Sequence, residues 1–314
     1  MTLMLLFSGL GLMAVPAWAR PLSRRLPPAE WARICACLLA AGAAVIEASL
    51  LIQAAPTALR ALGLEGIADY CEHALGAVTP GGAPVGITAA AGAVAIAVCA
   101  GRAVLKVRRT QRSTWVEQEI GWHGILGGYH LVVLPSPKPV AFSNGSRFGQ
   151  VVVTRGLITA LSDDQLTAVL CHELAHLRHR HQRYLLVAST VGTVLGWLPL
   201  VGQGVAALRC ALERWADEEA AGPAPGGRAN VRAALLRVAE LASLPEVAAF
   251  TPPGTVAERL EALQADPTSG RAFGPRTLVY LPAGMLLVAA VVALDSILAH
   301  VTFLHTLAGL CPPH

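Results

Sequence analysis

Four long apolar runs, separated by polar connections, set the pattern of this 314-residue chain. They cover residues 3–19, 34–55, 85–101 and 278–299, and each has the length of a membrane-spanning helix. The pattern therefore predicts a mainly α-helical, polytopic membrane protein with about four transmembrane helices.

The first run differs from a cleaved signal peptide in its charge pattern. Signal peptides carry basic residues before the apolar core, whereas here Arg20, Arg24 and Arg25 follow it. We therefore expect a retained span whose N-terminus lies outside the cell.

Basic residues in the connections set the expected orientation. Residues 20–33 contain four arginines and residues 102–112 contain five lysines or arginines, whereas residues 60–73 carry three acidic residues and one arginine. Basic residues collect on the cytoplasmic side of a membrane. Residues 102–276 are therefore expected in the cytosol of a bacterial cell, with both termini external to the plasma membrane.

Composition agrees with a bilayer environment. Hydrophobic residues make up 54% of the chain and charged residues 14%, and the mean hydropathy of +0.54 is too apolar for a soluble enzyme. The juxtamembrane arginines explain the net charge of +4 and favour anionic lipid headgroups. The lipid bilayer is thus an expected partner, and direct nucleic-acid binding is not expected.

A helix expected at 163–177 carries the most informative motif, His172-Glu173-Leu174-Ala175-His176. Ser162 is the expected N-cap of this helix, and acidic residues occupy its first turn. Positions four apart share one helical face, so His172 and His176 can bind one metal ion while Glu173 acts on a water molecule. The alternative is a solvated helix with two unrelated histidines.

A second pair of side chains with the same spacing follows at Glu213 and Asp217. A catalytic zinc site has three protein ligands, and Glu213 is the expected third. Asp217 is expected to accept a hydrogen bond from the outer nitrogen of a ligand histidine. The alternative is a solvated acidic face, because Glu218 and Glu219 follow directly.

The stretch at 185–208 is apolar for about the length of a span. A full crossing would separate His176 from Glu213 by a membrane, and the two could not share an ion. Glycines and Pro199 supply the breaks that a reversal needs. The metal hypothesis therefore predicts a membrane-associated hairpin here.

Together these residues predict zinc-dependent peptide hydrolysis. Zn²⁺ would polarise the scissile carbonyl and activate water, and Glu173 would be the catalytic general base. The group that stabilises the oxyanion stays open among His123, His130, His179 and Tyr184. For His179 and His181, a structural or surface role is favoured.

The cytosolic segment is expected to form an α+β, zincin-like metalloprotease domain. Runs of β-branched residues at 131–134 and 149–154 predict strands. Ala141, Phe142 and Ser143 are expected to form a short strand that binds substrate by main-chain pairing, with an ordinary core strand as the alternative. Helices are expected at 231–241 and 256–263; Arg259 in the second pairs with a carboxylate near the site or is exposed to solvent.

The chain thus divides into three expected parts. Residues 1–112 hold three transmembrane helices with their loops, and residues 113–276 hold the cytosolic metalloprotease domain with its hairpin. Residues 277–314 hold the last transmembrane helix and a short external tail. Cys71 and Cys311 would both be external, where thiols can pair.

These features together resemble the BlaR/MecR-type antirepressors, which are gluzincin-like membrane metallopeptidases of bacteria. The matching pieces are the three leading spans and the closing span, residues 141–145 and 153–157, the HExxH helix, and residues 213–217. The resemblance implies that His172, His176 and Glu213 are zinc ligands and that Glu173 is the base. It also implies a protein substrate, namely a winged-helix, BlaI/MecI-like repressor that is cleaved in a signal-transduction pathway.

One departure from that family and two further hypotheses remain. The BlaR/MecR sensors carry an external penicillin-binding domain after the last span, whereas 15 residues follow residue 299 here, so direct β-lactam sensing is not expected.

The chain also resembles HtpX-type proteases, which would degrade misfolded membrane proteins. A non-catalytic membrane transducer with a structural metal is the third hypothesis; an intact Glu173 argues against it, since a structural site needs no base.

Overall fold

The computed structural model describes residues 2–75, 82–118, 121–145, 149–222, 226–242 and 255–264. The predicted span at 278–299 and the expected pairing partner Cys311 lie outside these residues. The helices are α1 (Thr2–Trp18), α2 (Arg20–Ser23), α3 (Pro28–Ala61), α4 (Glu65–Leu75), α5 (Gly82–Gln118), α6 (Arg155–Ala160), α7 (Asp163–Arg178), α8 (His181–Leu195), α9 (Pro199–Ala221), α10 (Gly227–Ala242) and α11 (Thr255–Gln264). The strands are β1 (Trp122–Leu126), β2 (Tyr129–Leu134), β3 (Ala141–Asn144) and β4 (Gln150–Thr154).

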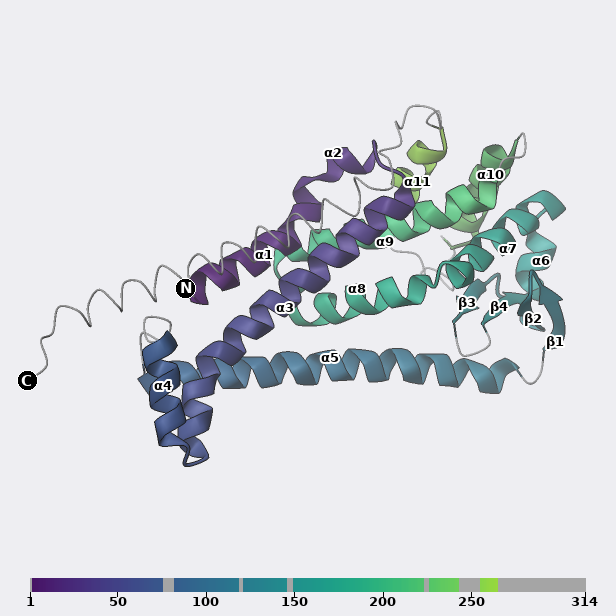
Figure 1. The fold of residues 1–314 in the computed structure, drawn as a ribbon. Coiled ribbons are helices and arrows are strands. Elements are labelled where there is room, and N and C mark those ends of the chain that lie inside the picture. Colours follow the sequence, from purple (N-terminus) through teal and green to yellow (C-terminus); the bar gives the residue numbers. More distant parts are fainter. Residues whose placement is uncertain are drawn as a thin grey trace, which may run out of the picture.

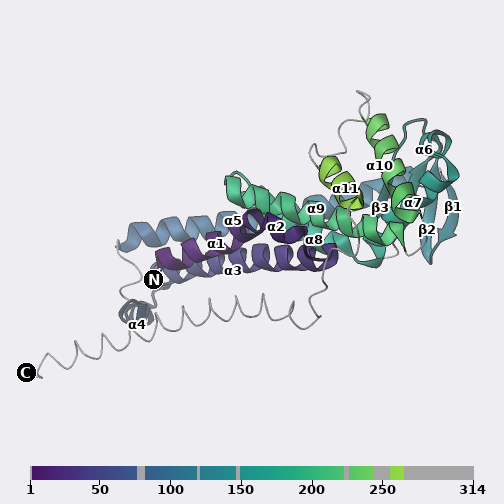
Figure 2. The same cartoon turned by 90° about the horizontal axis from the view of Figure 1, so that it is seen from above.

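Long helices form an elongated bundle, and the small sheet lies at one end of it (Figure 1). Turned by 90°, the structure again shows α1, α3 and α5 running alongside one another, with the sheet, α7 and α10 at the opposite end from the N-terminus (Figure 2). The described part of the chain is therefore mostly helical with a small sheet, as the sequence predicts.

The core of the bundle joins the N-terminal helices to the α8–α9 pair. Buried side chains of α1, α3, α8 and α9 form one apolar cluster that includes Met13, Leu39, Val191 and Leu208. At Gly204 of α9 a side chain would lie 2.7 Å from the backbone oxygen of Met13, so glycine permits this close approach of α9 to α1. The first half of α9 is thus fixed to the membrane-type helices.

Within the described residues, two helices are long and apolar enough to cross a membrane, namely α3 and the Gly82–Lys106 part of α5. Only 17% of the most apolar stretch in Gly82–Lys106 is buried within the protein, which suits a lipid-facing helix better than the core helix of a soluble protein. The first predicted span forms α1, whose apolar part, Leu5–Trp18, is shorter. Four transmembrane helices are therefore a prediction that two described helices support.

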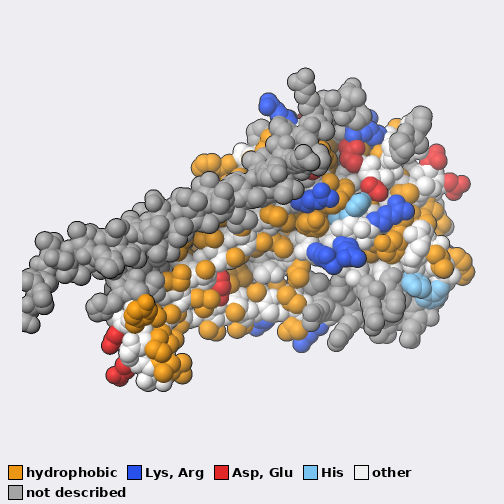
Figure 3. Space-filling model, in the orientation of Figure 1, with side chains coloured by type: hydrophobic (Ala, Val, Ile, Leu, Met, Phe, Trp, Pro, Cys, Tyr) orange, Lys and Arg blue, Asp and Glu red, His pale blue; other side chains and the backbone are white. Residues whose placement is uncertain are grey.

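The surface reflects the same division of the molecule. Hydrophobic side chains cover much of the long helices, whereas lysines and arginines gather toward the sheet end (Figure 3). Apolar side chains that face outward include Ile87, Val94 and Val98 of α5, each more than half exposed. Such a surface is stable when apolar surroundings cover it.

The apolar stretch at 185–208 forms a reversal rather than one continuous helix. Helix α8 ends at Leu195, α9 begins at Pro199, and the two helices pack against each other. Trp197 at the turn is 76% exposed. His176, which precedes the reversal, and Glu213, which follows it, therefore lie at the same end of the pair.

The sheet has the order β1-β2-β4-β3, with β2 and β4 parallel and the outer pairings antiparallel. The strands expected at 131–134, 141–143 and 149–154 are confirmed as β2, β3 and β4. Strand β1, which the sequence did not predict, adds an edge beside β2. Val151 of β4 is fully buried against Leu174 and Leu177 of α7, so the sheet supports one face of the motif helix.

Candidate metal centre

Helix α7 begins where the sequence predicts, and its start is well capped. The Ser162 hydroxyl accepts a hydrogen bond from the Gln165 backbone N–H, and the Gln165 side chain accepts one from the Ser162 N–H, which together form a capping box. Because Leu174 and Leu177 pack on the sheet, the face that bears His172 and His176 is left for α9. The helix therefore presents both histidines toward the bundle.

Helix α9 brings the second carboxylate pair to these histidines. Glu213 Oε2 lies 3.4 Å from His172 Nε2, Glu213 Oε1 lies 3.6 Å from His176 Nε2, and the two Nε2 atoms lie 3.2 Å apart. All three ligand atoms fall within 4.8 Å of one another. The histidine side chains are 13% and 12% exposed and Glu213 is 33% exposed, so the group is mostly enclosed but reachable from solvent.

This arrangement fits a tetrahedral metal ion. Ligand bonds of about 2.0–2.1 Å to Zn²⁺ at tetrahedral angles separate neighbouring ligand atoms by roughly 3.3–3.4 Å. The two Nε2 atoms lie 3.2 Å apart, Glu213 Oε2 lies 3.4 Å from His172 Nε2, and Glu213 Oε1 lies 3.6 Å from His176 Nε2. These distances are near that value, and each carboxylate oxygen faces one of the two histidines. Two imidazole nitrogens and a carboxylate oxygen are donor types that Zn²⁺ binds in proteins, so the donor set is suited to this cation.

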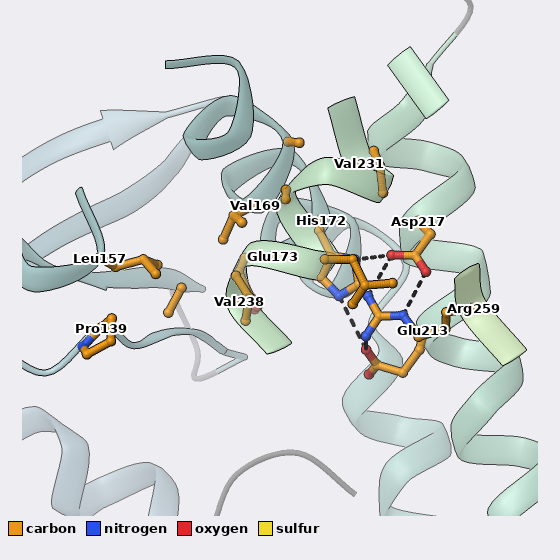
Figure 4. Close-up of a pocket in the computed structure, with 14 residues that line it drawn as sticks. Pro139, Leu157, Val169, His172, Glu173, Glu213, Asp217, Val231, Val238 and Arg259 are labelled. Carbon is orange, nitrogen blue, oxygen red and sulfur yellow. Dashed lines mark hydrogen bonds and ion pairs between the residues drawn. The ribbon is translucent and has the colours of Figure 1, made fainter. Parts of the chain in front are cut away.

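Asp217 and Arg259 extend the group behind His172 (Figure 4). His172 Nδ1 lies 3.0 Å from Asp217 Oδ1, and the Arg259 guanidinium of α11 donates to both Asp217 oxygens at 2.7 and 2.8 Å. Arg259 also lies 3.1 Å from Glu213 Oε2. Of the two alternatives that the sequence left for Arg259, pairing near the site is therefore confirmed, and its side chain is only 11% exposed.

The charged side chains of this group shift one another's pKa values. Burial lowers the pKa of His172, but hydrogen bonds to Asp217 and Glu213 outweigh burial and raise it to about 10. Burial opposes ionisation of Glu213 and Asp217, yet hydrogen bonds from His172, and from Arg259 to Asp217, keep the pKa of both carboxyls below their usual range. Burial and the positive charge of His172 lower the pKa of His176. Both carboxylates are therefore ionised at neutral pH.

His181 is a neighbour of the site that the sequence did not assign to it. Its side chain is fully buried, and its Nδ1 lies 2.8 Å from His176 Nδ1. The surface alternative is therefore wrong for His181. The sequence did contain a signal for this contact, because His181 follows the second histidine of the HExxH motif by five residues. The turn between α7 and α8 is what brings the rings of His176 and His181 together.

Glu173 lies in a cavity of about 160 Å³ beside the metal group. Ala141 of β3 lines the same cavity, and its remaining wall is mostly apolar, with Leu157, Val169 and Val238 among its residues (Figure 4). Among the described residues, Phe142 and Ser143 are not part of this lining, and neither are the expected oxyanion partners His123, His130, His179 and Tyr184. The arrangement joins a carboxylate, a metal-type donor set and an apolar surface in one cleft.

Known proteins match the same part of the chain. Residues 106–217 match the family model described as Peptidase family M48. This segment is M48-like. Peptidases of that family are zinc metalloproteases, so zinc is the metal that His172, His176 and Glu213 would bind. The M48-like segment includes the sheet, α7 and the hairpin, and it ends at Asp217.

Curated relatives carry the name protease HtpX homolog. Homolog 1 of Saccharolobus solfataricus is 38% identical over 68 residues, 21% of this chain and 22% of the relative. The homologue of Aquifex aeolicus is 34% identical over 74 residues, 24% of each chain. That of Syntrophotalea carbinolica is 30% identical over 93 residues, 29% of this chain and 33% of the relative. The matches thus span a third or less of these relatives, and no solved structure matches the chain.

Proposed function

We propose that this chain is a membrane-bound zinc endopeptidase in which His172, His176 and Glu213 hold the metal and Glu173 is the general base. The observation that carries the proposal is the convergence of these three ligand atoms within 4.8 Å from two separate helices. A catalytic zinc site keeps one position open, whereas a structural site is closed by a fourth protein ligand. Three donors among the described residues, beside a cleft, support the catalytic alternative.

The residues around the metal group have separate tasks in this proposal. Bound zinc would supply Lewis acidity toward a peptide carbonyl and toward water. Glu173 accepts a proton from the attacking water and delivers it to the leaving amine nitrogen. Asp217 holds the His172 proton on Nδ1, which keeps the Nε2 lone pair free. Arg259 balances the negative charge of Asp217 and Glu213.

The cleft indicates which part of a substrate would bind beside the scissile bond. A dry apolar cavity of about 150 Å³ holds a benzene-sized group, and the cavity here has about 160 Å³. Its apolar wall from α6, α7 and α10 would therefore accept one apolar side chain. The substrate backbone would pair with β3, which has β4 on one side in the described sheet. Ala141, Phe142 and Ser143 would then bind the main chain.

Two substrate classes were expected, and the relatives favour one of them. Their printed name, protease HtpX, supports the quality-control alternative over cleavage of a winged-helix repressor. We therefore propose misfolded membrane proteins as substrates. Comparing membrane proteins in cells that contain the natural chain or Glu173→Gln tests this choice: damaged membrane proteins should accumulate in the variant, whereas accumulation of one soluble repressor alone would favour the antirepressor alternative.

The membrane arrangement is part of the same proposal. The basic residues that flank α3 and α5 favour crossings that would leave the sheet and the metal group on the cytosolic side of a bacterial plasma membrane. The α8–α9 hairpin would enter from that side and return to it, with the exposed Trp197 at its tip. Reporters fused after Arg112 and after Arg228 should both be cytosolic. Reporters on opposite sides would contradict the hairpin.

Activity itself is tested with purified protein in detergent and an unfolded protein substrate. We expect cleavage that a zinc chelator abolishes and added Zn²⁺ restores. Glu173→Gln should retain zinc and lose activity, whereas Glu219→Gln, a matched change at a partly exposed position of α9, should not. Zinc binding without any cleavage would favour the non-catalytic transducer.

A further inference from the structure

The connection between α7 and α8 turns His181 back toward the metal group. Arg180 adopts a left-handed backbone conformation with φ 53°, the single non-glycine residue of the described chain that does so. This conformation is uncommon for a residue with a side chain and often marks a functional site. It ends one helix and starts the next within two residues, so the first side chain of α8 points into the core beneath His176.

Metal binding determines the direction of the hydrogen bond between the two rings. His176 Nε2 faces His172 Nε2 at 3.2 Å and must offer a lone pair to a metal. A neutral imidazole with a free Nε2 carries its proton on Nδ1. His176 Nδ1–H therefore donates to His181 Nδ1, which lies 2.8 Å away. The opposite direction would leave the proton on His176 Nε2 and block the metal.

The second nitrogen of His181 shows that packing alone does not explain a histidine at this position. If Nδ1 accepts, Nε2 carries the proton, and His181 Nε2 is a buried atom with no hydrogen-bond partner among the described residues. A buried donor without a partner is unfavourable, so packing alone would be served better by an apolar side chain. Trp215 and Tyr184 contact the ring, with centroids 4.7 and 6.4 Å away, and they restrict its orientation.

We infer that His181 is a positioning residue for the metal centre, which fixes the tautomer and the ring orientation of His176 by accepting its Nδ1–H. The two ligand histidines are then held by different partners: a carboxylate, Asp217, behind His172 and a neutral imidazole behind His176. The inference rests on the proposed metal site but not on peptide cleavage. Outer partners of this kind change metal affinity by about 10- to 100-fold when they are removed.

Two variants separate hydrogen bonding from packing. In His181→Asn, the amide oxygen stands near the position of Nδ1 and can accept the same proton, whereas His181→Leu has a similar bulk without an acceptor. Zinc affinity is measured by competition with a chromophoric chelator, and the absorption spectrum of the cobalt-substituted protein reports ligand geometry. His179→Leu is the control, because the His179 ring also lies against Trp215, with centroids 4.6 Å apart, and stacks on His181 at 5.9 Å, but has no hydrogen bond to His172 or His176 in the described structure.

The inference predicts a zinc dissociation constant 10- to 100-fold higher in His181→Leu, with an altered cobalt spectrum. His181→Asn should lie within about threefold of the natural chain, as should His179→Leu. Equal affinity in His181→Leu and the natural chain, or equal loss in the Leu and Asn variants, would overturn it. Should His181→Leu not fold, His181→Ala takes its place with the same expectations. A natural chain that binds no zinc would instead refute the proposed function.

Discussion

His172 Nδ1 lies 3.0 Å from Asp217 Oδ1, and this contact joins the motif helix α7 to α9. Asp217 is 3% exposed, and Arg259 from a third helix binds both of its oxygens. A carboxylate in this position fixes the histidine tautomer and makes the ligand nitrogen more basic. In the proposed zinc site, this charged pair behind His172 would support the ligand histidine without touching the metal.

Asp217→Asn should weaken zinc binding by about 10- to 100-fold, because a neutral amide binds the imidazole N–H less strongly and leaves Arg259 with Glu213 as its remaining carboxylate partner. Chelator competition measures this. Asp164→Asn, at an exposed position in the first turn of α7, is the matched control and should not change the affinity. An unchanged affinity in Asp217→Asn would remove Asp217 from the metal group.

Arg259→Met should destabilise the zinc-free protein by about 3 kcal/mol, because removing one partner of a buried ion pair leaves two carboxylates with only the protonated His172 to balance them. The affected charges are those of Asp217 and Glu213. Thermal or denaturant unfolding in detergent measures the loss, with Arg237→Met on the exposed face of α10 as control. Equal stability of the two variants would contradict this role of Arg259.

Zinc binding should release at least one proton near pH 7. Without metal, the pKa of His172 is raised to about 10, so its ring is protonated at pH 7, whereas a zinc ligand must be neutral. Affinity should therefore rise with pH, by roughly tenfold per unit from pH 7 to 9, and fall as the pH is lowered. Calorimetry in two buffers of different ionisation enthalpy counts the protons. Binding that is independent of pH would contradict the raised pKa.

Val238→Phe should change substrate preference rather than abolish activity, because the larger ring fills the apolar wall of the cleft. Peptides with leucine beside the scissile bond should lose at least about tenfold in kcat/KM relative to peptides with alanine. Leu236→Phe is the control on the same helix, since Leu236 is 41% exposed and does not line the cleft. A parallel loss for both peptides would mean that the cleft does not bind this side chain.

Local spacing was enough to predict that the central residues of the candidate site converge. The i, i+4 spacing on one helical face accounts for the convergence of His172 with His176, and the requirement for a third ligand pointed to Glu213. The same requirement predicted a reversal between residues 185 and 208. These inferences succeed because each depends on helix geometry and on the needs of one ion, and not on the details of packing.

Contacts that depend on distant packing could not be predicted. Arg259 lies 42 residues after Asp217, so its sequence neighbourhood does not distinguish pairing from exposure. His181 reaches His176 only through the left-handed turn at Arg180, which the residue type does not signal. Strand β1 contains Gly124 and few β-branched residues, and it is stabilised by pairing with β2. Phe142 and Ser143 share β3 with Ala141, but the cavity reaches Ala141 alone of these three.

Zinc content per chain is the most direct test of the account, because every assigned role depends on one ion held between α7 and α9. The natural protein and Glu173→Gln should each contain one zinc per chain after purification and dialysis, whereas His176→Ala and Glu213→Ala should contain almost none. Retention of a full equivalent of zinc by Glu213→Ala, with unchanged affinity, would contradict the central claim.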